Sequence, residues 1–95
     1  MATVGVLTLE LRMEHAHSLK DKRHVIKSLK ERLRNRHNIA IAEIDHQDLW
    51  QRAVLAAVTV SGDREHAREV LAAVENEAAA LVGASLVNAS VEWLD

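Results

Sequence analysis

The sequence predicts a small α+β domain in which strands and helices follow the order βαββαβ. Four segments alternate apolar and other residues with a period of two, and two segments repeat their apolar residues with the 3.6-residue period of a helix. Ninety-five residues are too few for two self-supporting cores, and the chain contains no proline. We therefore expect one domain over residues 1–95.

The first half of the chain predicts a strand and then a helix. Residues 3–13 alternate, and one face of this strand consists of Gly5, Leu7, Leu9, Leu11 and Met13. The period changes at Ser18, a residue type that caps helix N-termini, and Asn38 marks the expected end of the helix. Within the helix, four apolar residues fall within about 80° of arc: Leu19, Ile26, Leu29 and Leu33.

The second half predicts two strands, a helix and a final strand. Residues 39–44 alternate imperfectly, which indicates a bulge near Glu43. Residues 53–60 form the third strand, whose residues in phase toward the helices are expected to be Val54, Ala56, Val58 and Val60. A turn at residues 61–63 starts a helix that ends at Gly83. Its expected inward face is Ala67, Val70, Leu71, Val74, Ala78 and Leu81. The last strand, residues 86–94, groups Val87, Ala89, Val91 and Trp93 on one face.

This order of elements is that of the ferredoxin-like fold, a four-stranded antiparallel sheet with two helices on one face. In that fold the first and second strands run parallel with the third between them, so their C-terminal ends meet. The loop at residues 14–18, the start of the first helix and the connection at residues 45–52 should therefore gather at one end of the sheet. We expect a binding site at that end.

The composition excludes several kinds of site. The chain has no cysteine, so it has no disulfide, no thiolate nucleophile and no cysteine-ligated metal. No segment resembles a signal peptide or approaches the roughly 18 apolar residues of a membrane span. We expect a cytoplasmic protein that associates with no membrane and needs no cofactor.

Positive charge is concentrated on the first helix. Residues 18–37 carry a local charge of +6, although the whole chain has a charge of −2 and the remainder therefore −8. Five cations follow a 3-4-3-4 spacing that places them along about 21 Å of one helix flank: Lys20, Arg23, Lys27, Lys30 and Arg34. Such a flank either binds a polyanion such as RNA or covers the edge of the core with its aliphatic stems.

The residues predict no metal site and no catalytic site. His15, His17 and His46 could approach Asp45 and Asp48 at the loop end of the sheet, and imidazole with carboxylate suits zinc or nickel. This spacing fixes no third ligand, so metal binding by these histidines stays an open alternative. Residues 14–17 also lack the glycine-rich phosphate cradle that acylphosphatases of this fold place after the first strand. We therefore expect a protein that is not an enzyme.

The sheet face away from the helices is expected to be small and uncharged at its centre. By alternation it carries Val4, Val6, Thr8, Leu55, Ala57, Thr59, Asn88 and Ser90. Such a face either lies in solvent or pairs with a second copy of the chain. A homodimer through this open face is therefore a candidate assembly.

Three short motifs together resemble a known family: SLKDKR at residues 18–23, AEI at residues 42–44 and DLWQRA at residues 48–53. The sequence resembles the bacterial YlxP-like family, a family of unknown function, over essentially its whole length. The resemblance implies the ferredoxin-like fold but no activity, substrate or cofactor. Genes of the family often lie near those for translation initiation and ribosome-maturation factors, which implies RNA or a ribosomal particle as a partner.

The motifs select a second group of residues at the loop end of the sheet: Lys22, Glu43, Trp50 and Arg52. Lys22 lies within the apolar stripe of the first helix, so it could pair with Glu43 or Asp45 beneath Trp50 as a structural ion pair. The same group could instead bind a ligand. The sequence thus favours a non-catalytic protein that binds RNA or a ribosomal particle through the basic first helix. The alternative is a homodimeric structural or regulatory module that acts on another protein.

Overall fold

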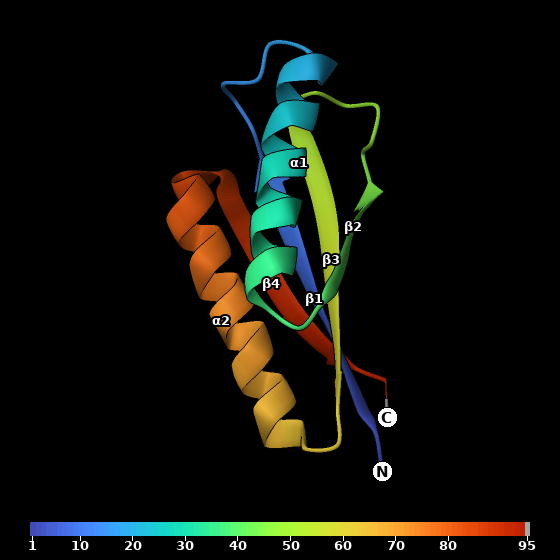
Figure 1. Ribbon diagram of the computed structural model, residues 1–95. Coiled ribbons are helices and arrows are strands. Elements are labelled where there is room, and N and C mark those ends of the chain that lie inside the picture. The colour runs from blue at the N-terminus through green and yellow to red at the C-terminus, as the bar shows by residue number, and fades with distance from the viewer. Residues whose placement is uncertain (95) are drawn as a thin grey trace.

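Both helices pack on the same face of one four-stranded antiparallel sheet (Figure 1) in the computed structural model, which describes residues 1–94. The strands are β1 (Thr3–Arg12), β2 (Ala40–Asp45), β3 (Arg52–Ser61) and β4 (Leu86–Trp93), in the spatial order β2-β3-β1-β4. The helices are α1 (Leu19–Arg36) and α2 (Arg64–Val82), and the 3-10 turn η1 (Gly83–Ser85) leads from α2 into β4. The predicted βαββαβ order and the ferredoxin-like arrangement are confirmed.

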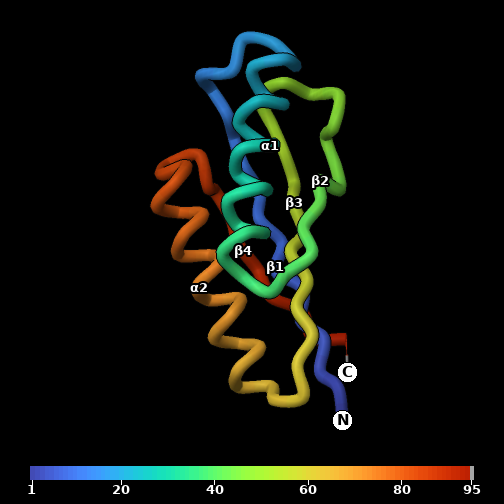
Figure 2. Tube along the Cα trace, viewed as in Figure 1, coloured from blue at the N-terminus to red at the C-terminus, as the bar shows by residue number. Residues whose placement is uncertain are grey.

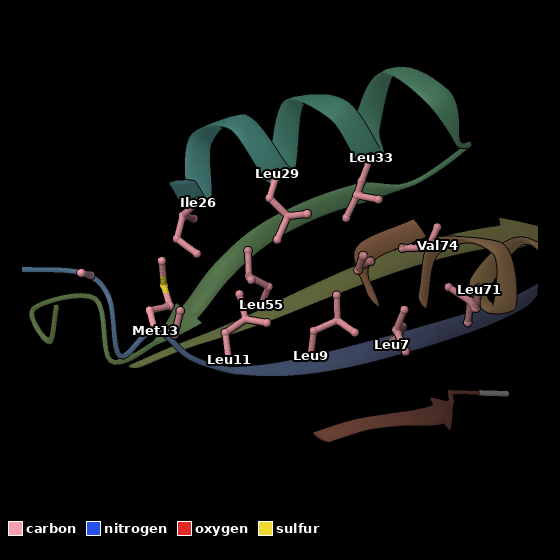
Figure 3. Close-up of a cluster of buried hydrophobic side chains, with 14 residues drawn as sticks. Leu7, Leu9, Leu11, Met13, Ile26, Leu29, Leu33, Leu55, Leu71 and Val74 are labelled. Atoms are coloured by element: carbon pink, nitrogen blue, oxygen red, sulfur yellow. The ribbon is translucent and has the colours of Figure 1, made fainter. Parts of the chain in front are cut away.

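The core lies between the sheet and the two helices. β1 presents alternate leucines to the helices, and α1 presents one apolar stripe to the sheet (Figure 3). The most deeply buried large apolar side chains of the core are Leu7, Leu9, Leu33, Leu55, Leu71 and Val74. Because tryptophan is the only aromatic residue type in the chain, cohesion depends mainly on close packing of these aliphatic side chains.

Local signals in the sequence set the helix ends. Ser18 Oγ accepts a hydrogen bond from Asp21 N at 3.0 Å, and Asp63 Oδ1 accepts one from Glu65 N at 3.1 Å. Each cap satisfies an N–H group that has no partner within the helix. α2 stops at Gly83, whose φ of 57° lies in a region that favours glycine. The predicted start of α1 and end of α2 are therefore confirmed.

The predicted facing of the third strand is wrong. The sequence places Leu55, Ala57 and Thr59 on the open face, yet all three are buried beneath the helices. Leu55 pairs directly with Leu9 of β1, and directly opposed residues of an antiparallel pair share a face. The open face instead receives Val54, Ala56, Val58 and Val60. The prediction failed because both faces of this strand are apolar, so alternation alone carries no information about which face is inward.

Two register shifts alter the edges of the sheet. The bulge predicted near Glu43 is confirmed, because the register of β2 against β3 shifts between Glu43 and Asp45. A second shift lies where β4 pairs with the end of β1. It places Leu86 opposite Leu11 and against the core and leaves Val87 53% exposed, so the predicted grouping of Val87 with Ala89, Val91 and Trp93 is interrupted at Val87.

The β1–α1 loop and the β2–β3 loop meet at one end of the sheet, as predicted (Figure 2). Met13 N donates a hydrogen bond to Gln51 O at 2.8 Å, which joins the two loops directly. Neither helix within residues 1–94 has an apolar stretch that could cross a lipid bilayer. We call the end of the sheet where the loops meet the loop end.

Gly5 lies where β1 meets both α2 and β4, and it leaves no room for a side chain. A Cβ atom at this position would lie 2.7 Å from Trp93 Cζ3 and 2.8 Å from Leu71 Cδ1. Gly5→Ala should therefore lower the free energy of unfolding by roughly 1–3 kcal/mol, because a packed side chain must move. Urea denaturation followed by circular dichroism measures this loss.

Gly62→Ala is the matched control, because no heavy atom beyond Gly62 and its two chain neighbours lies within 4 Å of the added methyl group. It should change the free energy of unfolding by less than about 1 kcal/mol. Equal destabilisation by the two substitutions would show that the close approach at Gly5 does not limit stability.

Candidate functional site

A buried ion pair joins α1 to β2 at the loop end. Lys22 Nζ lies 2.7 Å from Glu43 Oε2, and the Lys22 side chain is only 1% exposed. Lys22 takes one position of the buried stripe of α1, a turn before Ile26, so its aliphatic stem packs in the core. Of the two partners that the sequence allowed, Glu43 or Asp45, the structure selects Glu43.

The same ammonium group holds the turn between β2 and β3. Lys22 Nζ donates a hydrogen bond to the carbonyl oxygen of His46. His46 has a φ of 60°, a left-handed conformation that is uncommon for residues other than glycine. The turn is further fixed by bonds from Leu49 N to His46 O at 3.1 Å and from His46 N to Asp45 Oδ1 at 2.8 Å. Lys22 thus connects the start of α1 with the end of β2 and the turn that follows.

The environment of Glu43 indicates that this pair is part of the scaffold. Glu43 Oε2 is shielded from solvent and has no hydrogen-bond partner within residues 1–94 beyond its ion pair with Lys22. Removing the ammonium group would leave a buried carboxylate without compensation, which costs roughly 3–5 kcal/mol in comparable cases. The ammonium is also too buried to meet a ligand from solvent.

The other two motif residues lie apart from this ion pair. Trp50 is 43% exposed and lines a shallow hollow together with His17, Ser18 and Leu19 at the start of α1. Arg52 begins β3 and pairs opposite Arg12, which places it on the open face of the sheet. The motifs therefore meet at the loop end, but their side chains do not form one cluster.

The five cations predicted from their spacing lie together on one flank of α1, which we call the basic flank. Lys30 is half-buried and the other four are exposed: Lys20, Arg23, Lys27 and Arg34. Within residues 1–94, none of the five forms an ion pair or a side-chain hydrogen bond. The chain has 14 acidic residues against 12 basic ones, so this lack of partners does not follow from a shortage of acids.

The opposite flank of α1 packs toward α2 and does use its charges. Val25, Ser28 and Arg32 line a hollow shared with the end of α2. Glu77 of α2 forms an ion pair with Arg36, whose Nη1 lies 3.2 Å from Oε2, and its Oε1 lies within hydrogen-bond distance of His37 Nε2 at 2.7 Å. The basic flank therefore faces away from α2, on the side of α1 next to the edge strand β2.

The three histidines considered for metal binding lie in different places. His15 lines a hollow near Met13, His17 lies near Trp50, and His46 Nδ1 is 3.8 Å from Asp45 Oδ1. In the part of the chain that the structure describes, no three His, Asp or Glu side chains converge as metal ligands would.

A small apolar hollow between α1 and the end of α2 was not predicted from the sequence. It has a volume of about 210 Å³, with Leu11 and Met13 at its floor and the half-exposed Val25 and Leu81 at its sides. Ligand sites for small molecules usually measure roughly 300–1,000 Å³, so this hollow is smaller than most. It lies where the end of β1, the start of α1 and the end of α2 meet, and packing between such distant segments is not encoded in any local sequence pattern.

Comparison with known proteins identifies the family. The family model described as "Protein of unknown function (DUF503)" matches residues 4–91. The chain belongs to the DUF503 family. This DUF503 protein is also 39% identical over 61 residues to the uncharacterized protein YlxP of Bacillus subtilis (strain 168). That alignment covers 64% of this chain and 66% of YlxP, and it confirms the resemblance seen in the motifs.

Solved structures of similar shape are distant in sequence. The de novo designed protein Foldit4 matches with a TM-score of 0.61 at 14% identity, covering 100% of this chain and 98% of its own. The de novo designed protein LFR1 1, which has the ferredoxin fold, matches with a TM-score of 0.50 at 15% identity. That alignment covers 98% of this chain and 83% of LFR1 1. These similarities concern the fold alone.

Lys22→Met tests the structural role of the buried ion pair. The substitution keeps the volume of the stem but removes the ammonium group, so Glu43 Oε2 and His46 O lose a partner. The free energy of unfolding should fall by roughly 3 kcal/mol. Urea denaturation of the variant and the parent protein measures the difference.

Lys20→Met provides the control, since it makes the same change at an exposed position of the same helix. It should stay within about 0.5 kcal/mol of the parent protein. If Lys22→Met were as harmless as this control, the ion pair would not be part of the scaffold.

Proposed function

We propose that this DUF503 protein binds the phosphate backbone of structured RNA, free or within a ribosomal particle, through the basic flank of α1. The observation that carries the proposal is the row of five cations without an acidic partner among residues 1–94. A solvated row of cations on an acidic chain keeps its full charge available for a polyanion. Phosphate neutralisation with release of counterions then supplies the binding free energy.

The two ends of α1 are held firmly, which supports this use of the flank. Lys22 ties the first turn to β2, and His37 binds Glu77 directly after the last turn. The helix between these anchors spans about 21 Å from Lys20 to Arg34 at 1.5 Å per residue. Because the backbone of the helix is already ordered, only the lysine and arginine side chains lose conformational freedom when they meet an array of phosphates.

The distribution of aromatic residues favours recognition of the backbone over stacking on single-stranded bases. Trp93 lies on the helix side of the sheet, where it packs against the core and beneath the Arg64 guanidinium, 4.5 Å from the ring centre. Trp50 is exposed but lies beyond the start of the flank. Proteins that bind single strands without strong sequence preference combine cations with several stacking platforms. The gene neighbourhood of YlxP-like proteins favours RNA among the polyanions.

Binding of a short RNA duplex should depend steeply on salt. If all five cations contact phosphates, the logarithm of the association constant should fall by roughly 4.5 for each tenfold rise in salt concentration. Fluorescence anisotropy with labelled duplex across a sodium chloride series measures this slope. Arg34→Glu should weaken binding and reduce the slope by at least about 1.

Arg32→Glu is the matched control, because it makes the same charge reversal two residues away on the flank toward α2. It should weaken binding much less than Arg34→Glu. Equal effects of the two substitutions would indicate that RNA binding depends on the net charge of the protein rather than on the basic flank. Absence of binding to the duplex at low salt, with no co-sedimentation with ribosomal subunits, would refute the proposal.

A further inference from the structure

The open face of the sheet is apolar across three of its strands. The register places directly opposed residues in three rows from the N-terminal end of β1 toward its centre. The first row is Val4 and Val60, the second is Val6, Val58 and Ala40, and the third is Thr8, Ala56 and Ala42. No helix covers this face, because both helices lie on the other side (Figure 1).

This pattern differs from that of a sheet face exposed to water. Antiparallel sheets with one wet face alternate apolar and polar residues along each strand. Charged residues make up 27% of the chain, yet the three rows contain none on β1, β2 or β3. Charges border the rows on two sides. At the loop end Glu10 and Asp45 flank Val54 and Arg12 pairs with Arg52, and on the edge strand β4 Glu92 pairs opposite Val6. An apolar centre with a charged border is the organisation of a protein interface.

We infer that this open face is the interface of a homodimer in which two sheets pack face to face. The chemistry of the face selects a second copy of the chain as its occupant. The face has no cation in its rows to attract a nucleic acid or an anionic lipid surface, and no aromatic ring for stacking. In a two-fold dimer the same patch meets itself, so an uncharged apolar patch is complementary to its own copy.

The size of the face is sufficient for a stable pair. The whole open face comprises the apolar rows and their polar border, which includes Ser90 and Glu92 of β4. Its four strands, spaced roughly 4.8 Å apart and about eight residues long at roughly 3.3 Å each, cover about 500 Å². Two such faces bury about 1,000 Å² before the relief of the side chains is counted, which reaches the area that specific interfaces require. Both helices of each protomer remain on the outside of the pair, so the basic flanks stay exposed and this inference does not depend on RNA binding.

Sedimentation velocity over a range of concentrations tests the inference. The parent protein should sediment with twice its chain mass of 10.6 kDa, and Val58→Glu should sediment as a monomer. Val91→Glu is the matched control, because Val91 is a 45% exposed strand valine that pairs opposite Leu7 on the other face of the sheet. It should remain a dimer. A parent protein that is monomeric at every concentration would overturn the inference, as would a Val58→Glu variant that stays dimeric.

A cross-linking experiment answers the same question if Val58→Glu does not fold. The chain has no native cysteine, so a single cysteine can be introduced by Thr8→Cys at the centre of the face, or by Ser28→Cys on α1 as a control. Packed sheets lie roughly 10 Å apart. A bis-maleimide of that span should therefore join the single cysteines of two Thr8→Cys molecules into a covalent dimer. Thr8→Cys that cross-links no better than Ser28→Cys would contradict the inference.

Discussion

The ion pair between Lys22 and Glu43 determines how the loop end of this molecule is assembled. α1 carries a lysine where its buried stripe would ordinarily hold a leucine, so the surrounding structure must supply a carboxylate and a carbonyl oxygen. Glu43 supplies the first and His46 the second, and the bulge in β2 lies directly between them. The motifs that characterise the sequence are thus connected physically, because one ammonium group joins the start of α1 to the end of β2.

The remaining charges divide into those that hold the fold and those that are available to a partner. On the flank of α1 toward α2, Arg36 and His37 bind Glu77 and fix the distance between the helices. On the basic flank, cations such as Lys27 and Arg34 have no partner within residues 1–94. The open face lies on the other side of the sheet from both flanks, so a second copy and an RNA ligand would not compete for space.

Local signals in the sequence predicted the features that depend on local physics. Ser18 as a cap, the bulge at Glu43 and the place of Lys22 in the helical stripe follow from residue type and spacing alone. The facing of β3 could not be obtained in this way, because Val58 on the open face is as apolar as Leu55 in the core. The exposure of Val87 and the hollow between the helices were also missed, since both depend on register and packing between distant segments.

A double-mutant cycle between Lys22 and Glu43 tests the central claim most directly. The four proteins are the parent, Lys22→Met, Glu43→Met and the double variant, and the free energy of unfolding of each is measured in urea. If the pair is the constraint that organises the loop end, the double variant should recover stability relative to the less stable single variant, with a coupling of about 2 kcal/mol or more. Additive losses, with a coupling near zero, would show that the two side chains contribute independently and that the loop end is held by other contacts.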